Sequence, residues 1–129
     1  MTTPTSRKAA RRQALFLLYQ WDLTGQELAS LFEGEPDDFA RALAEAVAMR
    51  AAALDLRITA SSPDWPADRL GTLERNILRI GVYELEEETV PREVAINEAV
   101  VLAKRYATED ASRLVNGILA RVAREEEAA

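Results

Sequence analysis

The stretch that decides the fold is VPREVAINEAVVLAKRY at residues 90–106, followed almost at once by TEDASRLVNGILARVA at residues 108–123. Pro91 favours a helix start, because its missing N–H is among the donors that a first helical turn leaves unbonded anyway. Thr108 favours a second start, as an N-cap with two acidic residues directly behind it. The stretch therefore predicts two helices joined by a short acidic turn. Apolar residues at helical spacing form their core faces: Ala95, Ile96, Ala99, Leu102, Ala103 and Tyr106, then Ala111, Val115, Ile118, Leu119 and Val122.

The rest of the chain carries the same helical spacing, and its composition favours an all-α domain. Ala, Leu, Glu and Arg dominate, and these are strong helix formers. A single domain over 1–129 is expected at this length. The two prolines within residues 61–66 stop a helix and divide the domain into helical halves at about 6–60 and 66–125. Further helices are expected at about 6–23, 27–32, 37–60 and 72–87, with a short turn at 67–70. The 72–87 helix is apolar around most of its circumference, which predicts a central position.

Several classes of function are excluded by what the sequence lacks. It contains no cysteine and no histidine, so a disulfide framework, a thiolate metal site and the commonest general base are all missing. No nucleophile with a neighbouring base, metal-ligand cluster or phosphate-cradling glycine loop is present. We therefore expect no catalysis, no metal and no cofactor. The absence of cysteine favours an intracellular, cytoplasmic location, and no apolar run is long enough for a membrane span.

Charge is distributed unevenly along the chain. The first 21 residues hold four basic side chains and no acidic one, whereas the remaining 108 hold 12 basic and 22 acidic side chains. The basic cluster consists of Arg7, Lys8, Arg11 and Arg12, which project within about 140° of one helix face. It predicts a phosphate-binding strip, with Tyr19 as a stacking platform for an unpaired base. A solvated helix end is the alternative. Four phosphate contacts to single-stranded RNA imply that the logarithm of the binding constant falls with the logarithm of the salt concentration with a slope (the salt slope) of only about −2.8. Binding through this strip alone would be weak, so a partner is needed.

Other residues suggest further contacts. In the last helix, Gly117 lies on one face with Arg113 and two further arginines. Close helix packing is the favoured reason for this glycine, and approach of an RNA backbone is the alternative. Glu84 is expected to pair internally with an arginine or with Asn97, because a buried carboxylate needs a partner. Glu74 is predicted to face a basic protein partner. The run 125–127 is expected to be a frayed, solvated tail.

Several sequence blocks, taken in order, resemble the NusB family of transcription antitermination factors. They are ERNILRI at 74–80, YEL at 83–85, VAINEA at 94–99, TED at 108–110 and VNG at 115–117. The resemblance implies an all-α fold of about seven helices in two small packed bundles. It also implies binding of boxA-type RNA together with NusE, a ribosomal protein, and action on RNA polymerase during ribosomal RNA transcription. The implied RNA contacts are Arg7, Lys8, Arg11, Arg12, Tyr106, Asp110 and Leu114, and Glu74 is the implied NusE contact.

Two residues depart from the family pattern. Ala107 stands where a glycine is usual, and Leu114 stands where phenylalanine is more frequent, so base stacking at that point is lost. The predicted function is an RNA-binding antitermination factor in the RNA polymerase antitermination complex, with no membrane partner. A protein-only helical adaptor and a NusB-like accessory domain of an RNA methyltransferase are the alternatives. Exposed apolar residues leave a homodimer possible.

Overall fold

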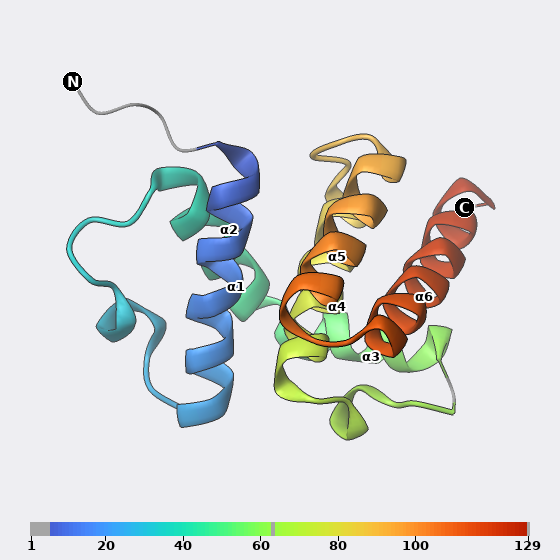
Figure 1. Cartoon of the computed structure of the whole chain (residues 1–129), viewed down its shortest axis with the longest axis horizontal. Helices are drawn as coiled ribbons and strands as arrows, with labels where there is room; N and C mark the ends of the chain where they lie inside the picture. The colour runs from blue at the N-terminus through green and yellow to red at the C-terminus, as the bar shows by residue number, and fades with distance from the viewer. Residues whose placement is uncertain (1–5, 63, 129) are drawn as a thin grey trace.

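The computed structural model describes residues 6–62 and 64–128, and within them the fold is all-α, as predicted (Figure 1). The described residues form six α-helices and two short 3-10 helices, where about seven helices were expected. The predicted helix at 27–32 and the predicted turn at 67–70 are the two 3-10 helices. The bounds are α1 Arg7–Thr24, η1 Leu28–Leu31, α2 Asp38–Met49, α3 Ala51–Ser61, η2 Ala67–Arg69, α4 Thr72–Glu87, α5 Arg92–Tyr106 and α6 Glu109–Ala128.

The prediction of one long helix over 37–60 is wrong, because the chain breaks at Arg50. Its backbone lies at φ −102° and ψ 10° between α2 and α3. The Arg50 guanidinium lies over the ring of Tyr83, 5.6 Å from its centroid, and the side chain pairs with Glu87. Both partners belong to α4, so the break coincides with tertiary contacts. No proline or glycine marks it in the sequence, and for that reason the helical spacing alone did not reveal it.

Helix caps fix the segments that surround the candidate site. The Ser6 hydroxyl accepts a hydrogen bond from the Ala9 N–H at 3.1 Å, which confirms the predicted cap of α1. Thr108 caps α6 in the same way, accepting from the Ala111 N–H at 2.9 Å. Each cap satisfies a backbone donor that the first turn would otherwise leave unpaired. These two caps set where the basic end of α1 and the acidic start of α6 begin.

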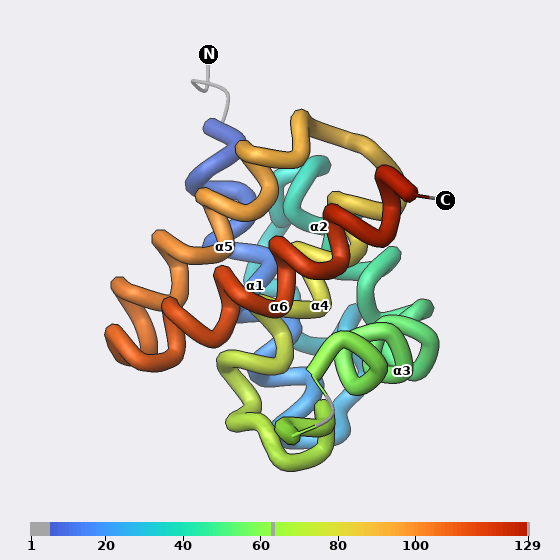
Figure 2. Tube along the Cα trace, turned by 90° about the vertical axis from the view of Figure 1, so that its right-hand side faces the viewer, coloured from blue at the N-terminus to red at the C-terminus, as the bar shows by residue number. Residues whose placement is uncertain are grey.

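Helix α4 is central, as its all-round apolar pattern predicted. It packs against α1 and α3 of the N-terminal half and against α5 and α6, and Figure 2 shows α6 running in front of it. Gly81 allows the close approach of α4 and α6, since a Cβ there would lie 2.6 Å from Leu119 Cδ1. Gly117 has no such role: it is exposed, and its Cβ would meet nothing within 4 Å. The favoured interpretation of Gly117 as a close-packing residue is therefore wrong.

Ion pairs join segments that are far apart in sequence. Asp22 on α1 accepts hydrogen bonds from Arg75 at 2.8 Å and from Asn76 and Arg79 at 3.0 Å, all on α4. Burial alone would raise the pKa of the Asp22 carboxyl, but the hydrogen bond from Arg75 and the charge of Arg79 outweigh burial and lower that pKa. Arg79 also holds Asp55 of α3 at 2.6 Å. The network ties α1, α3 and α4 together.

The acidic end of α6 is part of the folded body. Helix α6 continues to Ala128, Glu126 lies 3.0 Å from Arg57, and Glu127 lies 3.0 Å from Arg92. The prediction of a frayed tail at 125–127 is wrong, because the helix continues and arginines of α3 and α5 lie within ion-pair distance, whereas the predicted solvation holds for the exposed Glu125 and Glu127. Among the described residues, none of the helices combines the length and apolarity needed to cross a bilayer.

Candidate RNA-binding surface

The four basic residues of α1 do not share one environment. Arg11 is buried, with 3% of its surface exposed, and its Nε and Nη2 donate to both carboxylate oxygens of Glu84 at 2.9–3.1 Å. Glu84 is itself 1% exposed. The prediction that Glu84 pairs with an arginine is confirmed, and Asn97 is not the partner because it is exposed. The prediction that all four cations project from one solvent-facing strip is wrong for Arg11.

Arg11 is buried because of its position on α1. It falls at the border of the apolar face, three residues from Ala14 and seven from Leu18, and both of these are fully buried. Residues at those spacings lie on one side of a helix, so Arg11 is turned towards α4. A buried carboxylate on α4 then supplies the countercharge that a desolvated guanidinium requires.

The other three basic residues remain at the surface. The guanidinium of Arg7 lies over the Phe39 ring, 4.3 Å from its centroid, at the tip of α1. Lys8 is exposed, with its Nζ 3.7 Å from the Glu98 carboxylate. Arg12 is half-buried, and among the described residues no acidic side chain lies within ion-pair distance of it. We call Lys8 and Arg12 the basic strip, because they lie one turn apart on the same face of α1.

The basic strip leads to an aromatic surface. At 100° per residue, Lys8, Arg12, Phe16 and Tyr19 project within about 80° of one helix face. Tyr19 and Tyr106, both predicted RNA contacts, line one hollow together with Phe16 and Leu73. We call it the aromatic hollow. It brings α1, α4 and α5 together at one place on the surface.

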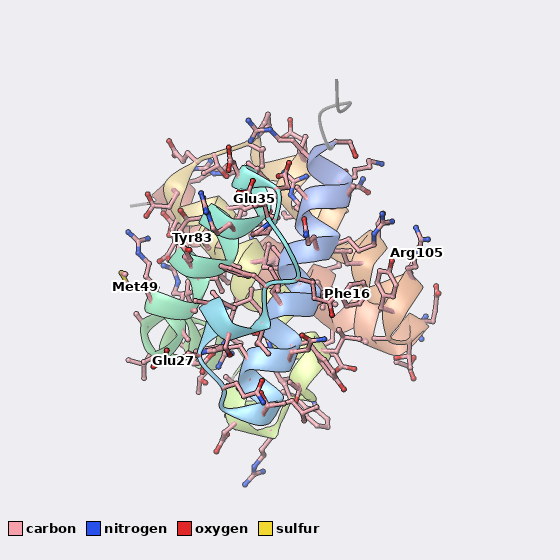
Figure 3. The ribbon with its side chains drawn as sticks, turned by 90° about the vertical axis from the view of Figure 1, so that its left-hand side faces the viewer. Phe16, Glu27, Glu35, Met49, Tyr83 and Arg105 are labelled. Atoms are coloured by element: carbon pink, nitrogen blue, oxygen red, sulfur yellow. The ribbon has the colours of Figure 1, made fainter. Side chains whose placement is uncertain are left out.

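The aromatic hollow itself has a volume of about 250 Å³. The rings of Phe16 and Tyr106 meet edge to face, with centroids 5.0 Å apart and planes at 78°. The Arg105 guanidinium lies 5.4 Å from the Tyr106 ring centroid, and Figure 3 shows Phe16 and Arg105 on the same side of the molecule. Our sequence reasoning missed Phe16. Its position four residues after Arg12 and three before Tyr19, outside the apolar arc of α1, was the signal that could have found it.

The remaining predicted site residues line a second hollow. Glu74, Asp110 and Leu114 surround a space of about 350 Å³ together with the half-exposed Trp65. We call it the acidic hollow. Asp110 is exposed and pairs with Arg113, while Glu74 and Leu114 are half-buried. Leu73 lines the aromatic hollow and Glu74 the acidic one, so the first turn of α4 separates the two.

Comparisons with known proteins identify the family of this chain. The family model described as the NusB family matches residues 8–124. The chain belongs to the NusB family. It is 40% identical over 121 residues to the transcription antitermination protein NusB of Rubrobacter xylanophilus, covering 88% of this chain and 87% of that protein. NusB is a non-enzymatic antitermination factor, so the family assigns no catalytic residue to either hollow.

Solved structures of NusB proteins share the fold. The structure of T. maritima NusB matches with a TM-score of 0.84 and 31% identity, covering 95% of this chain and 94% of that one. A crystal structure of the antitermination factors NusB and NusE in complex with double-stranded RNA matches with a TM-score of 0.82 and 31% identity, covering 92% and 96%. Within the described parts of this NusB-family chain, no group of three or more acidic residues is arranged to hold a metal ion.

Proposed function

We propose that this NusB-family protein binds boxA-type single-stranded RNA together with NusE and acts on RNA polymerase during ribosomal RNA transcription. The observation that carries the proposal is the continuous face of α1 on which the basic strip leads to the aromatic hollow. Cationic side chains hold phosphates, and aromatic rings stack unpaired bases. The protein thereby acts by binding free energy alone, in the cytoplasm where transcription takes place.

The proposed RNA site is small, which explains why a protein partner is needed. With Arg11 buried, the cations that α1 keeps at the surface are the exposed Arg7 and Lys8 and the half-buried Arg12. Three phosphate contacts on a single strand give a salt slope of about −2.1, or about 20-fold weaker binding for a fourfold rise in salt. The acidic hollow offers the second surface. Glu74 and Asp110 carry two negative charges against the one positive charge of Arg69, beside the apolar Trp65 and Leu114. A surface that is acidic on balance and partly apolar suits a basic protein such as NusE.

An RNA titration with and without NusE tests the proposal. We expect boxA-type RNA to bind more tightly than a scrambled RNA, NusE to increase the affinity, and Arg12→Ala to weaken binding. Arg41→Ala is the matched control, since Arg41 is an exposed arginine on α2 outside the strip. A protein-only adaptor would show no preference for boxA-type RNA and no effect of Arg12→Ala. That outcome would contradict the proposal.

A further inference from the structure

An exposed phenylalanine separates two hollows on the outer face of α1. Phe16 keeps 40% of its surface exposed and lines the aromatic hollow on one side. On its other side lies a hollow of about 250 Å³, to which Gln13, Gln20 and Phe32 also contribute. We call this second space the amide hollow. A large apolar side chain between two open spaces has no role in the core of the protein.

We infer that Phe16 is a base-stacking residue, inserted between two successive unpaired bases of the bound RNA strand. One base lies in the aromatic hollow and its neighbour in the amide hollow. This inference rests on the proposed RNA-binding function and adds a residue to it. The basic strip holds the phosphates of the RNA strand, and Phe16 holds two of its bases.

The geometry of Phe16 suits stacking. Tyr106 meets the Phe16 ring edge to face with centroids 5.0 Å apart, so the contact with Tyr106 fixes the orientation of the phenyl ring. A ring that is already oriented loses little conformational entropy when a base stacks on it. Aromatic stacking of unpaired bases is the usual way in which single strands are held, and it tolerates any base because every base has a flat face.

The charges around Phe16 favour RNA over a protein as the occupant. Arg12 lies one helical turn before Phe16, about 6 Å along the axis, and Lys8 lies one turn before that. The Arg105 guanidinium lies 5.4 Å from the ring centroid of Tyr106, which lines the aromatic hollow. Phosphates next to a base stacked on Phe16 would therefore have cations nearby on α1 and α5. Since most of the remaining charge of this chain is acidic, this face is where a polyanion is least repelled.

The amide hollow adds groups that can recognise a base by its edge. Gln13 and Gln20 lie seven residues apart on one side of α1, and each side chain has both donors and an acceptor. Glu33 lines the same hollow, and its carboxylate can accept a hydrogen bond that the amino group of a base donates. The base on this side of Phe16 is thus the one whose identity the protein can sense, while the aromatic hollow accepts its neighbour by stacking.

The test combines Phe16 variants with RNAs that lack one base. Titrations use a fluorescent boxA-type single-stranded RNA and the full chain. Phe16→Ala is expected to weaken binding about 5- to 150-fold, the range for loss of one base stack. The salt slope should stay unchanged, because Phe16 carries no charge. Phe16→Trp should retain the affinity and Phe16→Leu should lose it, since leucine keeps the apolar surface without a ring. Leu56→Ala is the matched control, an exposed apolar residue on α3.

A set of RNAs, each with one abasic nucleotide, then locates the contact. At one or two neighbouring positions, Phe16→Ala should cause no further loss, because the stacked base is already absent. At all other positions the full loss should remain. An equal loss at every position, or an affinity of Phe16→Leu equal to that of the wild type, would overturn the inference.

The outcomes also separate this inference from the proposed function. If the wild type binds RNA with a salt slope that depends on Arg12, but Phe16→Ala binds equally well, the stacking role alone is wrong. If the wild type binds no boxA-type RNA, both are wrong. If Phe16→Ala weakens NusE binding in the absence of RNA, Phe16 belongs to a protein interface, and the inference is again overturned.

Discussion

Two neighbouring arginines of α1 should show opposite phenotypes when each is replaced by methionine. Arg11 is the internal partner of Glu84, so Arg11→Met leaves a carboxylate with 1% exposure unpaired. Breaking a buried ion pair by removing one partner costs about 3–5 kcal/mol. At about 2.1 cal/mol/K of unfolding entropy per residue, the 129 residues translate this loss into a melting temperature about 10–20 °C lower.

The assay is thermal and urea unfolding followed by circular dichroism, with RNA titration at a temperature where the variants are folded. Arg11→Met should leave the salt slope of RNA binding unchanged. Arg12→Met should change stability by less than about 0.5 kcal/mol and make the slope shallower by about 0.7. The double variant Arg11→Met/Glu84→Leu should recover most of the stability, because well-packed apolar residues can replace a buried pair. An Arg11→Met protein of normal stability with a shallower salt slope would refute this reasoning.

Three further predictions concern the packing, the ion-pair network and the acidic hollow. Gly81→Ala should destabilise the folded protein by about 1–3 kcal/mol, because the added Cβ would lie 2.6 Å from Leu119. Gly117→Ala should stabilise it by up to about 1 kcal/mol. Urea unfolding of both variants measures the two changes, and equal changes would contradict the prediction. Asp22 has a lowered pKa in the folded protein, so its contribution to stability is present above its ordinary pKa of 3.8 and is lost as pH falls through the lower folded value. The stability difference between wild type and Asp22→Asn should therefore be large at neutral pH and shrink in acid, and a difference independent of pH would count against the network. Glu74→Gln should weaken NusE binding about 1.5- to 5-fold and should leave RNA binding in the absence of NusE unchanged. A loss of RNA binding in this variant would show that Glu74 belongs to the RNA-binding surface and would contradict its assignment to the NusE contact.

Local sequence patterns predicted the helices, but they could not predict where tertiary contacts interrupt or extend one. The caps at Ser6 and Thr108 and the central α4 follow from residue type and apolar spacing, and the structure has them. The break at Arg50 depends on Tyr83 and Glu87 of another helix. The ordered acidic end of α6 depends on Arg57 and Arg92. Neither contact is visible in the local sequence.

The sequence predicted only part of the candidate site, because contacts between helices also decide which of its residues reach the surface. Helical spacing placed the basic cluster on one face with Arg11 at the border of the apolar arc, but it could not show that Glu84 of another helix supplies a buried countercharge for Arg11. The sequence predicted Tyr19 as a stacking platform beyond the basic cluster, and the structure places Phe16 and Tyr106 beside it in one hollow. The resemblance to the NusB family supplied Tyr106, Asp110 and Leu114, and it named NusE as the partner for Glu74, whose place near the start of a helix had already suggested a basic protein partner. The structure then divided these residues between two hollows.

The salt dependence of RNA binding tests the central claim most directly. The affinity of boxA-type RNA for the NusE complex is measured over a range of salt concentrations, for the wild type and for Lys8→Ala/Arg12→Ala. Removal of two phosphate contacts should make the slope shallower by about 1.4, with the melting temperature nearly unchanged. Equal slopes for the two proteins would show that the phosphates lie elsewhere, and the basic strip would not be the RNA-binding surface.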